Sequence, residues 1–227
     1  SVMISVIVPT FNAATTLAST LECLSLTRPE LVREIVIADG GSNDGTVAIA
    51  SRFGCKIVHA SKGRGIQLRR GALAATQEWL LFLHADTVLA GNWGDAIVSF
   101  SQQKRSNESA GVFDFRLDDN TPGARLIERL VAARVRLLAL PYGDQGLFIS
   151  RALYDEIGGF SDIPLMEDVD IVRRIGRNRL PVLPAAAVTS AKKYRRDGYI
   201  FRSARNLFCL GLYFLGVPPK RILKLYG

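Results

Sequence analysis

The sequence is poor in the residues that hold small folds together through covalent or metal links. It contains three cysteines among 227 residues, far apart along the chain and without a C-x-x-C pair. An odd number of scattered cysteines does not build a disulfide framework, and the missing pair spacing argues against a zinc site. We therefore expect Cys23, Cys55 and Cys209 to be reduced, buried thiols.

Low-complexity tracts, internal repeats and an N-terminal targeting segment are also missing. The chain is 48% hydrophobic and 22% charged, which is typical of a folded globular protein. Its length favours one domain over residues 1–227 rather than two small ones. The N-terminus has neither the basic flank nor the long apolar stretch of a signal peptide, and we expect a cytoplasmic location.

Two common nucleotide-binding signatures do not occur. The loop Gly63–Leu68 begins like G-x-G-x-x-G, but Leu68 stands where the third glycine is required, and the loop does not follow the first strand-like run. No G-x-x-x-x-G-K-[ST] segment is present. A dehydrogenase is therefore disfavoured and a P-loop NTPase is excluded. The basic loop around Arg64 either holds a phosphate or forms an ordinary solvated turn.

Positive charge is concentrated towards the C-terminus. The net charge is +8, and residues 190–227 contain nine Lys or Arg against one acid, Asp197, whereas the other 20 basic and 20 acidic residues balance. Such a basic region contacts phosphates, whether on a nucleotide, a nucleic acid or an anionic membrane. We expect no nucleic-acid partner.

The order of apolar runs predicts an α/β fold. From residue 1 to about 115, short β-branched runs alternate with longer segments of helical spacing, as in βα units on a parallel sheet. The expected strands are residues 4–8, 34–38, 55–59, 79–83 and 146–150. The expected helices are residues 14–26, 44–53, 65–77, 124–140 and 167–176. We predict a Rossmann-like mixed, mostly parallel sheet flanked by helices.

Polar side chains follow three of these strands. Thr10 and Asn12 come after the first, Asp39 ends the second, and His84 and Asp86 follow the fourth. Open α/β sheets bind ligands just beyond the carboxyl ends of their strands, where an acid accepts hydrogen bonds from a base or ribose or ligates a hard cation. Taken singly, either aspartate is better explained as a turn residue or helix cap. The two in register favour ligand binding.

The densest acidic cluster is Glu167, Asp168 and Asp170, followed by Arg173 and Arg174. Three carboxylates within four residues repel one another, and this cost is tolerated where a base or a metal partner is needed. A helix N-terminus, whose dipole favours acids, is the alternative. The cluster modestly favours catalysis.

Four segments carry a resemblance to a known family. They are ISVIVPTFN at residues 4–12, DGGSNDGT at 39–46, LFLHADT at 81–87, and GGF at 158–160 with Glu167-Asp168. In order and spacing, over nearly the whole chain, they resemble glycosyltransferase family 2. More narrowly, the chain looks like the bacterial subgroup called radical-SAM/selenodomain-associated transferase 2 at HADT (84–87), PYGDQG (141–146) and PLMEDV (164–169). That subgroup name identifies no substrate.

The resemblance implies a GT-A fold, a nucleotide-diphosphate sugar donor that is usually a uridine diphosphate sugar, a divalent metal (Mn²⁺ or Mg²⁺), and inversion at the anomeric carbon. It makes residues 1–115 the nucleotide-sugar-binding half and residues 116–227 the acceptor-side half. Asp39 falls on the family's base-binding aspartate, Asp86 on the last acid of its D-x-D motif, and Asp168 on its catalytic base.

The resemblance also implies the wider site. The residues expected to bind the donor are Pro9, Thr10, Asn12, Asp39, Gly41, Arg64, His84 and Asp86. Those expected on the acceptor side are Asp144, Gln145 and Glu167. A simple turn is the alternative interpretation of Gly143–Gln145.

Two positions depart from the family pattern. His84 stands where the first Asp of D-x-D is common, which leaves one carboxylate, Asp86, for the metal. Imidazole binds manganese but is a poor magnesium ligand, and we expect His84 to contact the ribose or to lie beside the metal rather than to ligate it. Arg69 replaces an Asn often found two residues before the helix glycine, here Gly71, which leaves the details of donor binding open.

We predict single-displacement sugar transfer, in which Asp168 deprotonates an unidentified acceptor hydroxyl and Asp86 holds the metal at the departing diphosphate. A sugar-1-phosphate nucleotidyltransferase is one alternative, but such enzymes carry a Gly-rich loop after strand one, where Thr10–Ala14 has no glycine. A non-catalytic nucleotide-sugar-binding protein is the other. The reduced motif at His84 supports it, and the joint presence of Asp39, Asp86 and Asp168 opposes it.

The C-terminal run Leu207–Val217 has eleven apolar residues, against the ~20 needed to cross a bilayer. Arg202 and Arg205 precede it, and three further basic residues follow. It is either an interfacial helix that brings the enzyme to the inner face of the cytoplasmic membrane and a lipid-linked acceptor, or a helix packed on the sheet. Packing on the sheet is the favoured interpretation.

Overall fold

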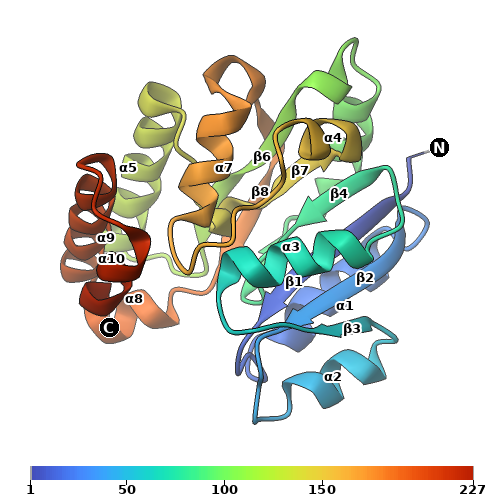
Figure 1. Cartoon of the computed structure of the whole chain (residues 1–227), viewed down its shortest axis with the longest axis horizontal. Coiled ribbons are helices and arrows are strands. Elements are labelled where there is room, and N and C mark those ends of the chain that lie inside the picture. The colour runs from blue at the N-terminus through green and yellow to red at the C-terminus, as the bar shows by residue number, and fades with distance from the viewer. Residues whose placement is uncertain (1, 227) are drawn as a thin grey trace.

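In the computed structural model, which describes residues 2–226, eight strands form one mixed sheet flanked by helices (Figure 1). The strands are β1 (Ile4–Thr10), β2 (Val32–Asp39), β3 (Lys56–His59), β4 (Trp79–Phe82), β5 (Thr87–Leu89), β6 (Ala110–Leu117), β7 (Leu147–Ser150) and β8 (Val182–Thr189). The α-helices are α1 (Leu17–Thr27), α2 (Thr46–Arg52), α3 (Arg64–Ala74), α4 (Trp93–Ser101), α5 (Pro122–Leu138), α6 (Arg151–Glu156), α7 (Glu167–Ile175), α8 (Lys192–Asp197), α9 (Tyr199–Phe214) and α10 (Pro219–Tyr226). Short 3-10 helices are η1 (Ser106–Glu108), η2 (Gly143–Gln145) and η3 (Arg177–Arg179).

The strand order across the sheet is β3-β2-β1-β4-β7-β6-β8-β5. The first four strands in this order are parallel, β7 runs antiparallel to β4 and β6, β8 is parallel to β6, and β5 is antiparallel to β8. This arrangement confirms the predicted mixed, mostly parallel sheet.

Strand β1 shows why the parallel strands are apolar along their whole length. All seven of its residues are buried. Successive side chains of a strand point to opposite faces, so Val6 and Val8 join an apolar cluster with α1 and α4, whereas Ile7 joins another with α3 and α7. Helices therefore cover both faces of this part of the sheet, as its continuous apolar strands require.

Helices α1 and α3 are each shorter than predicted at one end, where side chains from other segments hold the adjoining backbone. Helix α1 begins at residue 17 rather than 14, since the amide of Ala13 donates to Thr46 Oγ1 at 2.8 Å. Helix α3 ends at residue 74 rather than 77, since the amide of Thr76 donates to Glu34 Oε1 at 2.6 Å. The Thr76 amide has thereby exchanged a helical acceptor for Glu34, whereas the Ala13 amide lies before the helix and needs an acceptor outside it.

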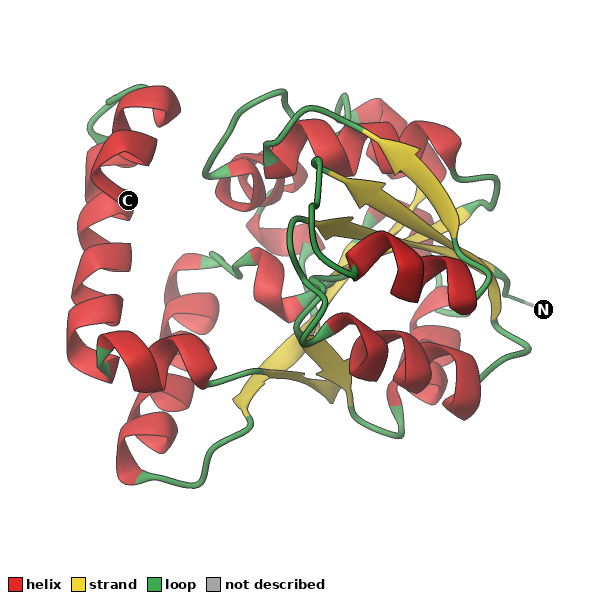
Figure 2. Ribbon diagram, turned by 90° about the horizontal axis from the view of Figure 1, so that it is seen from below, coloured by secondary structure: helices red, strands yellow, loops and turns green. Residues whose placement is uncertain are grey.

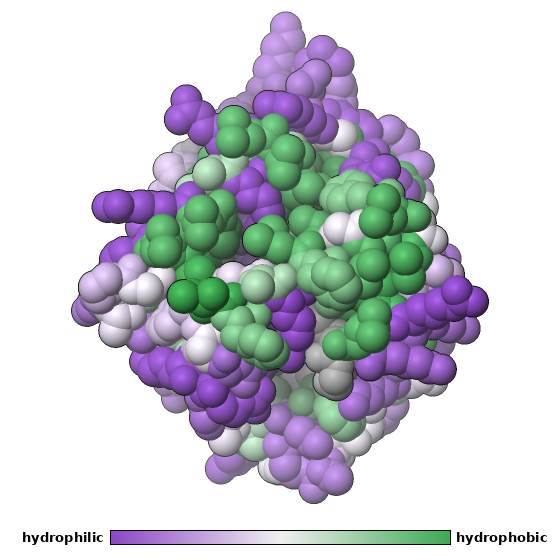
Figure 3. Space-filling model, turned by 90° about the vertical axis from the view of Figure 1, so that its left-hand side faces the viewer, coloured by the Kyte–Doolittle hydropathy of each residue, from purple (hydrophilic) through white to green (hydrophobic). Residues whose placement is uncertain are grey.

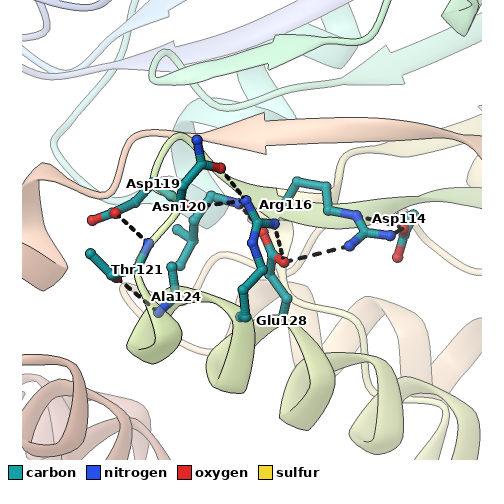
Figure 4. Close-up of polar contacts among 9 residues, drawn as sticks. Asp114, Arg116, Asp119, Asn120, Thr121, Ala124 and Glu128 are labelled. Carbon is teal, nitrogen blue, oxygen red and sulfur yellow. Dashed lines mark hydrogen bonds and ion pairs between the residues drawn. The ribbon is translucent and has the colours of Figure 1, made fainter.

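A buried acid attaches α5 to the sheet (Figure 4). Glu128 Oε1 accepts from the amide of Leu117 in β6 at 3.0 Å. Its Oε2 lies 2.6 Å from Arg125 Nη1 and 3.4 Å from Arg116 Nη1. A buried carboxylate is tolerated when it is paired and hydrogen-bonded. The network therefore fixes α5 against β6 and removes the only acid of α5 from the surface.

The C-terminal helices correct the favoured interpretation of the sequence. Helix α9 packs mainly against α5, α8 and α10 rather than on the sheet, and these helices form one side of the molecule, opposite the N-terminus (Figure 2). Its buried residues are Cys209 and Leu210. Arg202 and Arg205 turn inward and pair with Asp197 at 2.9 and 3.7 Å, so this part of the inner surface of α9 is polar.

No helix within residues 2–226 is long and apolar enough to span a bilayer. The three cysteines are free thiols, as predicted. Only Cys209 is buried, however, whereas Cys23 and Cys55 are half-buried.

Candidate active site

The ends of β1, β2 and β4 meet at one edge of the sheet, and the segments that follow β1 and β4 line a cleft of about 520 Å³. Thr10 of β1 pairs with Asp39 of β2, and His84 follows β4, the other neighbour of β1. Six of the eight predicted donor-site residues line the cleft: Pro9, Thr10, Asn12, Arg64, His84 and Asp86. Asp39 and Gly41 do not line it.

Asp39 is 1% exposed, and hydrogen bonds already occupy its carboxylate. Oδ1 accepts from the hydroxyls of Thr10 (2.7 Å) and Ser42 (2.6 Å), and Oδ2 accepts from the amides of Gly41 (3.1 Å) and Ser42 (2.8 Å). Burial alone would raise the pKa of Asp39, but the bonds from Ser42 and Thr10 hold it below its usual value. A carboxylate accepts about four hydrogen bonds, so a base contacts Asp39 only by displacing one of these donors.

The loops after β1 and β2 are tied together through Asn12. Its backbone has a φ of 50°, its amide donates to Ser42 Oγ at 2.9 Å, and its side-chain oxygen accepts from the amide of Asn43 at 2.9 Å. Asn is among the few residues that enter the left-handed region readily, because its short polar side chain bonds locally. This link holds one rim of the cleft in place.

The N-terminal end of α3 reaches the cleft through close packing. A Cβ on Gly65 would lie 2.2 Å from the carbonyl oxygen of Ser161, so only glycine allows this approach. Arg64 Nε lies 3.1 Å from Oε1 of Glu167, which is fully buried. Neither oxygen of Glu167 accepts a hydrogen bond from another described residue, and burial raises the pKa of its carboxyl to about 7. Glu167 thus positions Arg64 at the cleft.

His84 packs directly against η2. A Cβ on Gly143 would lie 2.6 Å from Nε2 of His84, so this contact requires glycine at position 143. Burial lowers the pKa of His84 to about 4, and the nearby Arg64 acts in the same direction. The imidazole is therefore uncharged at neutral pH and suited to hydrogen bonding within the cleft.

Backbone amides from two elements hold Asp168. Its Oδ2 accepts from the amide of Gly143 at 2.8 Å, and its Oδ1 accepts from the amide of Val169 at 2.8 Å. Each oxygen retains a further acceptor site. The residue lines a second pocket, of about 120 Å³, which adjoins the cleft because Arg64, His84 and other residues line both. A fixed carboxylate at a pocket wall is suited to accept a proton.

The predicted acceptor-side residues separate in the structure. Asp144 lines the smaller pocket, its Oδ1 is enclosed without a hydrogen bond from a described residue, and burial raises the pKa of its carboxyl to about 6. Gln145 and Glu167 do not line this pocket. Gln145 instead donates to the carbonyl of Phe113 at 3.0 Å and accepts from the amide of Tyr142 at 3.3 Å, so it supports the η2 turn.

Asp86 is the carboxylate best placed for a divalent metal. Its side chain is 22% exposed, and Nζ of Lys193 lies 3.8 Å from its Oδ2. Across residues 2–226, no cluster of three or more His, Cys, Asp or Glu side chains is arranged to hold a metal. Mn²⁺ and Mg²⁺ take oxygen ligands, and phosphates and water readily supply part of their coordination shell. The residues therefore fit a metal that is shared with a bound diphosphate, not one held by the protein alone.

Several residues of both cavities come from the C-terminal region, and none of them is among the site residues predicted by number from the sequence. They are Ser190, Lys192, Lys193 and Arg196 in the cleft, and Tyr194, Arg202 and Asn206 in the smaller pocket. The excess of positive charge after residue 190 is the signal that pointed to them, since cations in a cleft attract phosphates. The larger cleft thus draws on both predicted halves of the chain.

Arg69, the second departure from the family pattern, does not line either cavity. Its Nη1 donates to the carbonyl oxygens of Phe160 at 3.1 Å and Gly158 at 3.4 Å. The arginine therefore braces the Gly158–Phe160 segment against α3.

The sequence matches Glycosyl transferase family 2 over residues 5–161. The chain belongs to this family. The matched range includes Asp39, Arg64, His84 and Asp86, whereas Asp168 lies beyond it.

Curated relatives of this family 2 chain are mycobacterial. A PGL/p-HBAD biosynthesis glycosyltransferase from Mycobacterium bovis (strain BCG / Pasteur 1173P2) is 39% identical over 95 residues, which cover 38% of this chain and 36% of that protein. The protein of that name from Mycobacterium tuberculosis (strain ATCC 25177 / H37Ra) gives the same values. The match therefore spans about a third of the length of these relatives.

Solved structures show the fold. Glucosyl-3-phosphoglycerate synthase from Mycobacterium tuberculosis, in complex with Mn²⁺, uridine diphosphate and glucosyl-3-phosphoglycerate, has a TM-score of 0.58 at 19% identity, over 84% of this chain and 71% of that one. S. aureus TarS 1-349 has a TM-score of 0.63 at 16% identity, over 92% and 64%. These likenesses confirm the predicted GT-A-type fold of the family 2 chain.

Proposed function

We propose that this family 2 chain is an inverting glycosyltransferase, which moves a sugar from a uridine diphosphate sugar to the hydroxyl of an unidentified acceptor. The observation that carries the proposal is the pair of adjoining cavities, one a large cleft with basic residues and the other a small pocket with Asp168 at its wall. The relatives support it, since curated ones are named glycosyltransferases and a neighbour of the same fold binds Mn²⁺ and uridine diphosphate.

The larger cleft is the donor side of the proposal. Four cationic residues line it, namely Arg64, Lys192, Lys193 and Arg196, and together they attract a diphosphate. Base recognition by Asp39 requires that a base N–H replace one of its present donors, such as the Ser42 hydroxyl that lies 2.6 Å from Oδ1. Thr10 and Asn12 form the adjoining rim.

Asp86 would hold Mn²⁺ or Mg²⁺, which when bound neutralises charge on the departing diphosphate. Because Lys193 lies 3.8 Å from Asp86, its ammonium group can contact the same diphosphate. His84, uncharged beside Asp86, contributes a hydrogen bond to the ribose or to the diphosphate.

The smaller pocket is the acceptor side. Asp168 takes the proton of the acceptor hydroxyl while the hydroxyl oxygen bonds to the anomeric carbon, and the bond from that carbon to the diphosphate oxygen breaks. The products are an inverted glycoside and a nucleoside diphosphate. The amides of Gly143 and Val169 keep the base in place, and Asp144 is available to hydrogen-bond other acceptor hydroxyls.

One observation favours a second candidate, a nucleotide-sugar-binding protein without turnover. The motif around His84 and Asp86 offers a metal one carboxylate instead of two. The orientation of Asp168 by two amides favours catalysis, because a binding protein has no need for an oriented base. Membership of the radical-SAM/selenodomain-associated transferase 2 subgroup remains a proposal based on its three short motifs.

The test measures both binding and turnover. The chain is titrated by calorimetry with uridine, guanosine and adenosine diphosphate sugars in the presence of Mn²⁺ or Mg²⁺, and release of nucleoside diphosphate is followed with water and with candidate acceptors. We expect the uridine donors to bind most tightly, to depend on the metal and to release uridine diphosphate. Binding without release with any acceptor favours the second candidate. Release of pyrophosphate from UTP and a sugar 1-phosphate indicates a nucleotidyltransferase, and failure to bind any nucleotide sugar overturns the proposal.

A further inference from the structure

Three helices share a surface that is both apolar and cationic. We define the apolar face as the exposed residues of α5, α9 and α10, and Figure 3 shows apolar side chains gathered on the side of the molecule where these helices lie. Large members of the face include Leu126, Leu130, Phe201, Leu207, Phe208 and Leu225. The helices pack on one another, because α9 contacts both α5 and α10.

Helix α9 exposes apolar residues and turns its charged residues inward. Every exposed residue of this helix is apolar: Ile200, Phe201, Ala204, Leu207, Phe208, Gly211 and Phe214. Arg202 and Arg205 instead lie inward, where they pair with Asp197. A surface helix of a water-soluble protein normally turns its polar side outward. The outer surface of α9 is thus suited to an apolar environment.

The exposed charges around this outer surface have one sign. Helix α5 exposes Arg129 and Arg136, and α10 exposes Lys220, Arg221 and Lys224. The acid of α5, Glu128, is buried against β6, and the described parts of α9 and α10 contain no acid. The apolar face therefore combines exposed leucine and phenylalanine with cations and has no exposed carboxylate among its described residues.

We propose that the apolar face docks on the surface of an anionic lipid bilayer. Its leucine and phenylalanine side chains would enter the boundary between headgroups and acyl chains, while its cations contact lipid phosphates. A second copy of this chain is a poorer occupant, because two such faces bring like charges together and neither supplies an acid. The sequence-based interpretation changes in two ways: α5 joins the face, and Arg202 and Arg205 do not.

The test is vesicle co-sedimentation of the intact chain at about 0.1 M salt, without any nucleotide sugar. Vesicles are made of phosphatidylcholine alone or with 30 mol% phosphatidylglycerol. We expect the partition coefficient to be more than ~30-fold higher on the anionic vesicles, as for at least two lysines near the surface. Because no donor is present, the result is independent of the proposed transfer activity.

Two double variants separate the apolar and ionic contributions. F201S with F208S should lower binding to anionic vesicles by ~10-fold or more, and its control is L26S with L73S, two leucines on α1 and α3 that are somewhat more exposed than the phenylalanines. K220Q with K224Q should lower binding to anionic vesicles ~20-fold and leave binding to phosphatidylcholine unchanged. All substitutions are at exposed positions, and unfolding temperatures equal to that of the parent show that each variant is folded.

Three outcomes overturn the proposal. One is equal partition of the parent on both vesicle types. Another is unchanged binding of the F201S with F208S variant. The third is a dimer in sedimentation equilibrium that the same two substitutions convert to a monomer, since the face would then be an interface between two copies of the chain.

Discussion

The parallel strands and the C-terminal helices of this chain use apolar residues in opposite ways. In β1 every side chain is buried, and leucines of α1 and α3 cover the strand from both sides. In α9 two residues are buried, while its phenylalanines face outward. The first region is built to stabilise the domain, and the second is built to present a surface. The two cavities lie where the regions meet, because residues of β1 and α8 line the same cleft.

The largest expected effect is at Asp168, which lines the smaller of the two cavities. Asp168→Asn preserves the size of the side chain and most of its hydrogen bonding but cannot take a proton at neutral pH. We expect transfer to fall by ~10²–10⁴-fold, with affinity for the uridine diphosphate sugar nearly unchanged. Single-turnover rates and calorimetry on the same variant provide the two measurements.

Glu167→Gln and Asp170→Asn are the neighbouring controls. If Asp168→Asn keeps activity within a few-fold of the parent, the base lies elsewhere, with Glu167, Asp170 and Asp144 as the remaining acids. A tenfold loss of donor affinity in Asp168→Asn would instead make Asp168 a donor or metal contact.

The second prediction compares the same substitution in both regions. Leu21→Ala removes a fully buried side chain of α1, whereas Leu207→Ala removes one that is 59% exposed on α9. We expect the first to lower the free energy of unfolding by ~2–5 kcal/mol and the second to change it by less than ~0.5 kcal/mol. Urea denaturation of both variants checks this. Similar losses would mean that α9 is part of the stabilising core and that the contrast is wrong.

The third prediction concerns the buried acid between the regions. Burial raises the pKa of Glu167 from 4.5 to about 7, so the folded chain binds this proton more tightly than the unfolded chain does. This carboxyl therefore lowers stability progressively as the pH rises from about 4.5 to 7. Glu167→Gln does not titrate, and we expect its free energy of unfolding to rise by about 2–3 kcal/mol relative to the parent over that range.

The measurement is urea denaturation of the parent and of Glu167→Gln at several pH values. A Glu167→Gln variant that becomes relatively less stable with increasing pH would show that the ion pair with Arg64 outweighs burial.

The smallest effect is expected in the cleft. Lys193→Gln removes one cation from beside Asp86, and we expect the dissociation constant of uridine diphosphate with Mn²⁺ to rise about tenfold, as for the loss of one charged hydrogen bond. Lys104→Gln, on an exposed loop, should have no effect. Equal affinities of the parent and Lys193→Gln in calorimetry would remove α8 from the donor site.

Local patterns predicted the parallel part of the fold well and the rest less well. Strand β1 is a continuous apolar run ending at polar residues, so the approximate ends of the strand can be predicted from the sequence. Strand β8 has no comparable signal, because Pro184 and a series of alanines disfavour a strand. Its pairing with β6 is interrupted between Phe113 and Asp114, opposite the proline, and this irregularity accommodates the residue.

The candidate site divides in the same way. Asp86 and Asp168 stand in recognisable motifs, and both line the cavities. The position of Lys193 at the cleft was not predicted, because it depends on how the chain folds back after β8. The hydrogen bonds that already occupy the Asp39 carboxylate were not predicted either, since they depend on which way the hydroxyls of Thr10 and Ser42 point.

Helix α9 lines the smaller pocket with Arg202 and Asn206 and turns Phe201 and Phe208 outward. One helix thickness, ~10 Å, therefore separates the pocket from the apolar face. On a bilayer, this thickness would set the height of the pocket above the lipid boundary. With the apolar face docked as proposed, acceptor hydroxyls at about that height above the lipid boundary would enter the smaller pocket, whereas those level with the headgroups or far above them would not. Acceptors would then be selected by the height of their hydroxyl above the membrane as well as by its chemistry. The enzyme would encounter them by diffusion in the plane of the membrane.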